Sequence, residues 1–225
     1  MLGLSVWREA VLGQRESPAD VVVASAADLS WFEGQSTPAT AQQVYPQSLV
    51  YMDDGVDKFV RFTAVGYPSA TDGAAYVRWK RESRDGLYRW RVRIGGTAAD
   101  PTLHYGSEPY ARCTPGATGL TLFSGGPYRF SNTLRQRIRR IIDGTITDLL
   151  TSSVSPDAPH NVWYWHEMQV LGNSISSRYY QTTPGAWNTV TDAGIPAAPG
   201  QYCGIRARLR LNQYCDIREV HFIPA

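Results

Sequence analysis

Residues 162–180 read VWYWHEMQVLGNSISSRYY, two runs of alternating side chains separated by the turn Gly172-Asn173. Alternation with a period of two is typical of a strand with one buried face and one solvated face. A Gly-Asn pair between two such runs indicates a tight hairpin turn. We therefore predict two antiparallel strands over residues 162–170 and 175–180.

The same alternation recurs on both sides of this hairpin. Trp90 and Val92 alternate with arginines, as do Ile205 and Ala207, and Asp143-Gly144 predicts a second hairpin. The other predicted strands span residues 21–23, 49–51, 58–65, 75–80, 88–94, 120–123, 128–130, 133–143, 145–150, 205–211 and 214–223. Gly125-Gly126-Pro127 is interpreted as a turn, and no amphipathic helix is predicted after residue 16. The sequence therefore predicts an all-β protein, a two-sheet antiparallel sandwich.

Length and composition fit this fold class. A chain of 225 residues is ordinary for one β-sandwich, and 12% of its residues are aromatic. The formal charge of +2 gives no reason to expect a nucleic acid or an anionic membrane as partner. No apolar run approaches the roughly 18 residues needed to span a bilayer. We divide the chain into a loop-rich N-terminal segment, 1–57, and a sandwich, 58–225, which together form one compact unit.

The N-terminal segment begins with a stretch that lacks the features of a secretory signal. Residues 1–16 are predicted to form a short amphipathic helix or an extended arm. Such a stretch would either pack on its own sandwich or dock on a neighbouring molecule. The residues predicted for the docking arm are Leu4, Trp7, Val11 and Leu12.

Cysteines and acidic residues give no metal or cofactor signature. Cys113, Cys203 and Cys215 show no metal-ligand spacing, so we predict reduced thiols made in a cytosol, with a Cys203–Cys215 disulfide left open. The cluster Asp53, Asp54 and Asp57 is interpreted as a solvated turn, with a calcium site as the alternative. The prediction is no metal and no cofactor.

A resemblance emerges in the C-terminal third. Its motifs are Val162-Trp163-Tyr164-Trp165, the Gly172-Asn173 turn, Trp187, Gly200-Gln201-Tyr202-Cys203-Gly204 and Val220-His221-Phe222. This stretch resembles the concanavalin A-like, laminin-G-like lectin and glucanase superfamily, and the resemblance implies a jelly-roll sandwich. Domains of this style also resemble small structural proteins of tailed bacteriophages. Motifs this degenerate support the fold better than the function.

An active site is not predicted. The glucanase branch carries Glu-x-Asp-x-x-Glu on one strand, a motif that this sequence lacks, and Gly-x-Ser-x-Gly and phosphate-binding loops are missing as well. His166 and Glu167 are neighbours on a strand and face opposite ways, so they cannot act on one substrate atom. We predict that His166 is buried with Ser177 as hydrogen-bond partner.

Outward-facing aromatic and arginine side chains are the candidate binding residues, because both types are enriched at binding hot spots. The alternative is that the arginine rows are solvated faces and that Trp165 packs under a loop. The candidates are Trp165, Glu167, Gln169, Arg178, Tyr180, Arg206, Arg208 and Arg210.

From these features the sequence favours a non-enzymatic virion protein of a bacteriophage, a head decoration or a tail or fibre component. It would be assembled in the bacterial cytoplasm and dock as a homo-oligomer on other virion proteins. The alternative is a lectin-like module that recognises a cell-surface glycan, and a glycan hydrolase or lyase is the third hypothesis.

Overall fold

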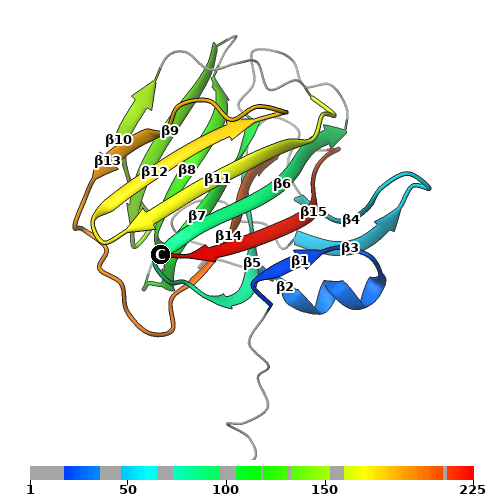
Figure 1. Ribbon diagram of the computed structural model, residues 1–225, viewed down its shortest axis with the longest axis horizontal. Helices are drawn as coiled ribbons and strands as arrows, with labels where there is room; N and C mark the ends of the chain where they lie inside the picture. Colours follow the sequence, from blue (N-terminus) through cyan, green and yellow to red (C-terminus); the bar gives the residue numbers. More distant parts are fainter. Residues whose placement is uncertain are drawn as a thin grey trace, which may run out of the picture.

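The computed structural model describes residues 18–35, 47–64, 73–96, 105–117, 119–130, 133–152, 160–209 and 212–225. The predicted docking arm (Leu4, Trp7, Val11 and Leu12) and Arg210 lie outside the described residues. Within them, two antiparallel sheets pack face to face, and a short 3-10 helix, η1 (Ala26–Trp31), lies beside β1, β2 and β3 (Figure 1). The predicted all-β sandwich is confirmed.

Sheet A has eight strands in the order β13-β12-β11-β6-β15-β4-β3, with β1 paired to β15. The strand β15 therefore has three partners, β1, β4 and β6. The bounds are β1 Asp20–Val22, β3 Gln47–Asp53, β4 Lys58–Ala64, β6 Gly86–Gly96, β11 Tyr164–Leu171, β12 Ser174–Tyr180, β13 Asn188–Thr191 and β15 Gln213–Pro224.

Sheet B has seven strands in the order β10-β9-β8-β7-β14-β5-β2. The strand β14 thus joins β5 to β7. The bounds are β2 Phe32–Gln35, β5 Gly73–Glu82, β7 Tyr105–Pro115, β8 Leu120–Phe130, β9 Thr133–Ile142, β10 Thr145–Ser152 and β14 Tyr202–Leu209.

Most predicted strands are present, and the differences have physical reasons. The hairpin of β11 and β12 turns at Gly172 with Val170 opposite Ile175, as its alternation predicted. The interpretation of Gly125-Gly126-Pro127 as a turn is wrong, because these residues continue β8 and pair with β9. Strand β7 was not predicted, since the polar pair Ser107-Glu108 and Pro109 interrupt its apolar pattern.

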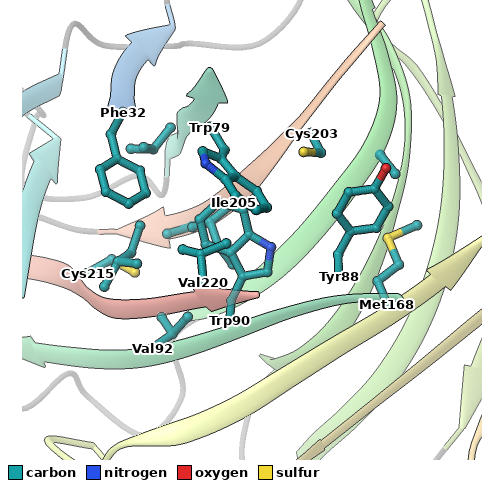
Figure 2. Packing of buried hydrophobic residues seen from close by; sticks show 14 of the residues in the cluster. Phe32, Trp79, Tyr88, Trp90, Val92, Met168, Cys203, Ile205, Cys215 and Val220 are labelled. Atoms are coloured by element: carbon teal, nitrogen blue, oxygen red, sulfur yellow. The ribbon is translucent and has the colours of Figure 1, made fainter. Parts of the chain in front are cut away.

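The core lies between the inner faces of the two sheets (Figure 2). Trp79 of β5 and Trp90 of β6 meet edge to face with ring centroids 5.8 Å apart, which joins sheet B to sheet A. Cys113, Cys203 and Cys215 are buried and unpaired. No helix among the described residues has the length and apolar character to cross a membrane.

Candidate functional site

The predicted binding residues fall on two opposite faces of the sandwich. Trp165, Glu167 and Gln169 of β11 occupy the strand positions that alternate with core residues of sheet A. Arg206 and Arg208 of β14 occupy the corresponding positions of sheet B. Because the core separates these two outer faces, the candidates do not form one site, and each face is considered on its own.

The outer face of sheet A carries a row of ionisable side chains at directly facing positions of neighbouring strands. Arg178 lies opposite Glu167, Glu167 opposite Arg89, Arg89 opposite His221, and His221 opposite Asp20. The row crosses β12, β11, β6, β15 and β1. Opposite charges on directly facing positions stabilise strand pairing, so the register of β11 with β12 and β6 is electrostatically favourable at Glu167.

Glu167 contacts both of its neighbours in this row. Its carboxylate accepts hydrogen bonds from Arg178 Nε at 2.6 Å and from the Tyr180 hydroxyl at 2.7 Å, and Arg89 Nε lies 3.3 Å away. Glu167 was expected to face away from the core, and on that face it is buried: 3% of the residue is exposed, and Tyr180 is 7% exposed. The strand alternation was correct, but long side chains from both neighbouring strands cover the carboxylate.

Trp165 lies beside Glu167 on the same face and is partly buried. The Arg89 guanidinium sits 3.9 Å from its ring centroid, Arg91 sits at 5.3 Å, and the His221 ring centroid is 5.7 Å away. Contacts of this kind attract a cation to the electron-rich ring face. Gln169 and Arg178 are also partly exposed. We call Trp165, Gln169, Arg178, Arg89 and Arg91 the Trp165 face.

Asp216 of β15 anchors the other end of sheet A. Its side chain is fully buried, and both Arg61 and Arg93 donate to it, with the shortest contact 2.7 Å from Arg61 Nε to Oδ1. The Arg61 guanidinium also lies 3.4 Å from the Tyr214 ring centroid. Charge-assisted bonds of this geometry are among the strong ones, so they hold this part of the face rigid.

The acidic turn between β3 and β4 uses its carboxylates internally. Asp54 Oδ1 accepts the backbone N–H groups of Val56 and Asp57, and these bonds hold the pKa of Asp54 below its ordinary value. Asp57 accepts from the Trp163 indole at 2.9 Å and pairs with Arg218. In the described parts of the chain, no group of three or more His, Cys, Asp or Glu is arranged to hold a metal ion.

Sheet B carries a buried charge cluster on its outer face. Arg137 Nε donates to Glu108 at 2.7 Å, and Arg206 Nη1 lies 3.3 Å from the other carboxylate oxygen. Ser124 donates to Glu108 as well, at 2.9 Å, and Arg206 Nε donates to the Tyr76 hydroxyl at 3.0 Å. The alternative that the arginine row is a solvated face therefore does not hold for Arg206, which is 2% exposed, while Arg208 is partly exposed.

The Arg137 side chain can reach Glu108 because a glycine lies between them. Arg137 belongs to β9 and Glu108 to β7, so the intervening strand β8 separates them. Gly126 of β8 lies directly opposite Arg137 and contributes no side chain. A Cβ added at Gly126 would come within 2.7 Å of the Ser107 carbonyl and 3.1 Å of the Glu108 Cα. The guanidinium therefore crosses β8 over a position that only glycine leaves clear.

The electrostatics of the cluster follow from its burial. Burial raises the pKa of Glu108, but Arg137 and Arg206 outweigh this effect and hold its pKa well below the ordinary value. Burial also lowers the pKa of Arg137 to about 10. A buried carboxylate shared by two arginines remains ionised, because both partners favour its charged form. Glu108 could not be recognised from the sequence because β7 was not predicted, and Arg137, although in a predicted strand, could not be linked to it for the same reason.

His166 lies between the sheets, as predicted, but its partner differs. Ser107 Oγ lies 3.3 Å from Nδ1, whereas Ser177 accepts a hydrogen bond from Gln136. Burial lowers the pKa of His166 to about 4. The ring is 3% exposed and thus unsuited to meet a substrate from solvent.

Comparison with known proteins places the fold among lectin-like domains. No protein-family model and no curated protein sequence matches the chain. The exoplasmic/lumenal domain of VIP36, in a Ca²⁺-bound form, matches with a TM-score of 0.60 and 10% identity over 92% of this chain and 90% of that one. A legume lectin-like domain from Entamoeba histolytica matches with a TM-score of 0.56 and 10% identity, over 90% and 94% of the two chains.

A third similar structure comes from a bacteriophage. The CBM2 module of the evolved Dit of Lactobacillus casei BL23 phage J-1 matches with a TM-score of 0.51 and 11% identity, over 86% of this chain and 89% of that one. At these identities the likeness shows the fold alone. The chain has the two-sheet sandwich of lectin-like domains.

Proposed function

We propose that the protein is a non-enzymatic carbohydrate-binding module whose ligand contacts the Trp165 face. The sequence favours a virion role, but the structural neighbours support the glycan alternative better, since two of the three are lectin-like domains. VIP36 has also been crystallised with mannose bound. The observation that carries the proposal is Trp165, a partly exposed indole on an outer sheet face, fixed among arginines.

The chemistry of this face suits a sugar. An aromatic ring offers an apolar surface for the C–H face of a pyranose, and nearby polar groups fix its orientation. Arg178, which faces Glu167, supplies donors on the same sheet face, and Gln169 supplies another further along β11. Arg178 is held by Glu167 at 2.6 Å, and its guanidinium lies 4.1 Å from the Trp187 ring centroid. Because these groups are ordered before binding, the entropy cost of ordering them in the complex is small.

A glycan array probed with the purified protein tests this proposal. Specific binding of at least one glycan is expected, and Trp165→Ala should weaken it about tenfold or more while the far-ultraviolet circular dichroism is unchanged. Leu171→Ala, at an exposed position on the same strand, is the matched control and should leave binding intact. Equal binding by Trp165→Ala and the unmodified protein would move the ligand away from this face.

A second candidate function is a structural component of a bacteriophage particle that presents such a module. Its support is the likeness to a module of the phage J-1 Dit. The predicted docking arm would then attach the sandwich to other virion proteins as a homo-oligomer assembled in the bacterial cytoplasm. Immunogold electron microscopy of particles from the source organism tests it. Regular label at the head or tail is expected, and particles without label would rule this candidate out.

A further inference from the structure

A second tryptophan lies on the same outer face as Trp165. Trp187 directly precedes β13, and its neighbour Asn188 donates a hydrogen bond to Gln136 of sheet B, so Asn188 points inward. Because side chains alternate along an extended chain, Trp187 points outward. The Arg178 guanidinium, which belongs to the outer face, lies 4.1 Å from the Trp187 ring centroid. Trp187 thus extends the Trp165 face beyond β12.

Both tryptophans offer a polar group as well as a ring. Trp165 and Trp187 are partly exposed. Among the described residues, none accepts a hydrogen bond from either indole N–H, and these two N–H groups reach the surface, whereas those of Trp79 and Trp90 are buried in the core. Since an indole N–H can only donate, each of the two surface tryptophans presents an apolar ring and an unused donor to a ligand.

The charged groups around the two rings are mainly hydrogen-bond donors. Arg178 and Arg89 face Glu167 from the strands on either side of it. The Glu167 side chain is 4% exposed, whereas the side chains of Arg178 and Arg89 are 21% and 34% exposed. The buried carboxylate holds both guanidinium groups in place, while part of each arginine side chain stays in contact with solvent. A ligand rich in hydroxyl oxygens would therefore meet donors along this stretch of the face.

The spacing of the two rings decides the size of the ligand. Strand β12 lies between β11, which carries Trp165, and β13, which Trp187 precedes (Figure 1). Neighbouring strands are roughly 5 Å apart, so the two positions are separated by about 10 Å across the sheet. A single pyranose is comparable in width to one aromatic ring and covers only one of the two indoles. Sugars joined in a linear chain can cover both.

We propose that the ligand of the Trp165 face is the interior of a linear polysaccharide chain, with one sugar stacked on Trp165 and a later sugar of the same chain stacked on Trp187. The inference rests on the proposed carbohydrate-binding function and adds the class of glycan. Once the first sugar is stacked, the second contact is intramolecular and costs little further translational freedom. The two rings therefore select long chains over single terminal sugars.

Affinities for oligosaccharides of different length test the inference. Isothermal titration calorimetry would compare the disaccharides and hexasaccharides prepared from cellulose, amylose, β-mannan and chitin. In at least one of these series, the hexasaccharide should bind about tenfold more tightly than the disaccharide, a gain of the size expected for one additional aromatic contact.

Two substitutions and a control locate the second contact. Trp187→Ala should remove the gain that the unmodified protein shows with the hexasaccharide and leave the affinity for the disaccharide within about twofold. Trp187→Phe, which keeps an aromatic ring, should retain most of the gain. Trp165→Ala should weaken the binding of both. Thr183→Ala, at an exposed position of the same loop, is the matched control and should change neither.

The outcomes separate this inference from the proposed function. A gain due merely to the larger number of disaccharide units in a hexasaccharide would persist in Trp187→Ala and would overturn the inference. Equal affinity for the two lengths, or no binding of any of these fragments, would overturn it as well. In those cases a glycan-array ligand that is lost in Trp165→Ala would still support the proposed function. Glycan binding unaffected by Trp165→Ala would overturn both.

Discussion

The hydroxyl of Tyr110 on β7 donates a hydrogen bond to the carbonyl of Val77 on β5 at 3.1 Å, although β14 runs between these two strands. The bond passes over Gly204 of β14, which pairs with Tyr110. Sheet B thus has two places where a side chain crosses a neighbouring strand over a glycine, the other being Arg137 over Gly126.

Gly204→Ala is therefore expected to destabilise the protein strongly. A Cβ at this position would lie 2.0 Å from the Val77 carbonyl oxygen and 2.5 Å from the Tyr110 ring. Overpacking of this kind costs about 1–3 kcal/mol or more, because the backbone must shift. Urea denaturation measures the effect. Gly185→Ala is the control, since nothing lies within 4 Å of the added Cβ, and it should leave the free energy of unfolding within about 0.5 kcal/mol.

Glu108→Gln should lower the free energy of unfolding by about 3–5 kcal/mol, because the variant leaves the buried cations Arg137 and Arg206 without their shared anion. The folded-state pKa of Glu108 is below its ordinary value of 4.5, so its stabilising effect is complete above that pH and is lost as the pH falls toward the folded-state pKa. The difference in unfolding free energy between the unmodified protein and the variant should narrow below pH 4.5. A difference that stays constant down to pH 3 would show that the Glu108 charge is not what stabilises the fold.

The buried His166 should make the stability of the fold depend on pH in a second, separate range. Its pKa is lowered by burial from the ordinary value of 6.5 to about 4, so the unfolded chain binds the proton first. Stability should therefore decline as the pH falls from 6.5 to 4, by at most about 3 kcal/mol for this shift. His166→Gln should flatten the decline in this window, as followed by thermal unfolding at several pH values. Unchanged pH dependence in the variant would assign the decline to other groups.

The three cysteines are expected to resist modification in the folded protein. Burial raises the pKa of the Cys113 thiol to about 12 and raises the pKa values of Cys203 and Cys215 as well. Since the thiolate is the reactive form, a thiol reagent such as Ellman's reagent should react very slowly with the native chain and fully in guanidinium chloride. Rapid reaction of one thiol under native conditions would show local opening around it.

The sequence predicted which neighbouring strands pair, but it did not predict which outward-facing side chains are buried. The hairpin of β11 and β12 could be predicted because its alternation and its Gly172-Asn173 turn are both local signals. The burial of Arg206 could not, because alternation gives the face of a strand and not what covers it. Here Arg206 contacts Tyr76 and Glu108, which come from distant parts of the chain. Glu108 was missed for the same reason, since its strand is recognisable only through its partners in sheet B.

The order of strands has a consequence for how the chain folds during synthesis. The strand β14 separates β5-β2 from β7-β8-β9-β10 in sheet B, and β15 separates β6-β11-β12-β13 from β4-β3 in sheet A. Both come later in the sequence than every other described strand, so they leave the ribosome after their partners. Until they emerge, the described strands of sheet B form two unconnected parts and those of sheet A form three, since β1 pairs with β15, and all of these parts have exposed edges. Closure of the sandwich must therefore follow translation of residues 202–224, and pairings of such long sequence separation form slowly. A nascent chain paused before this point would be a natural substrate for chaperones that bind exposed strand edges.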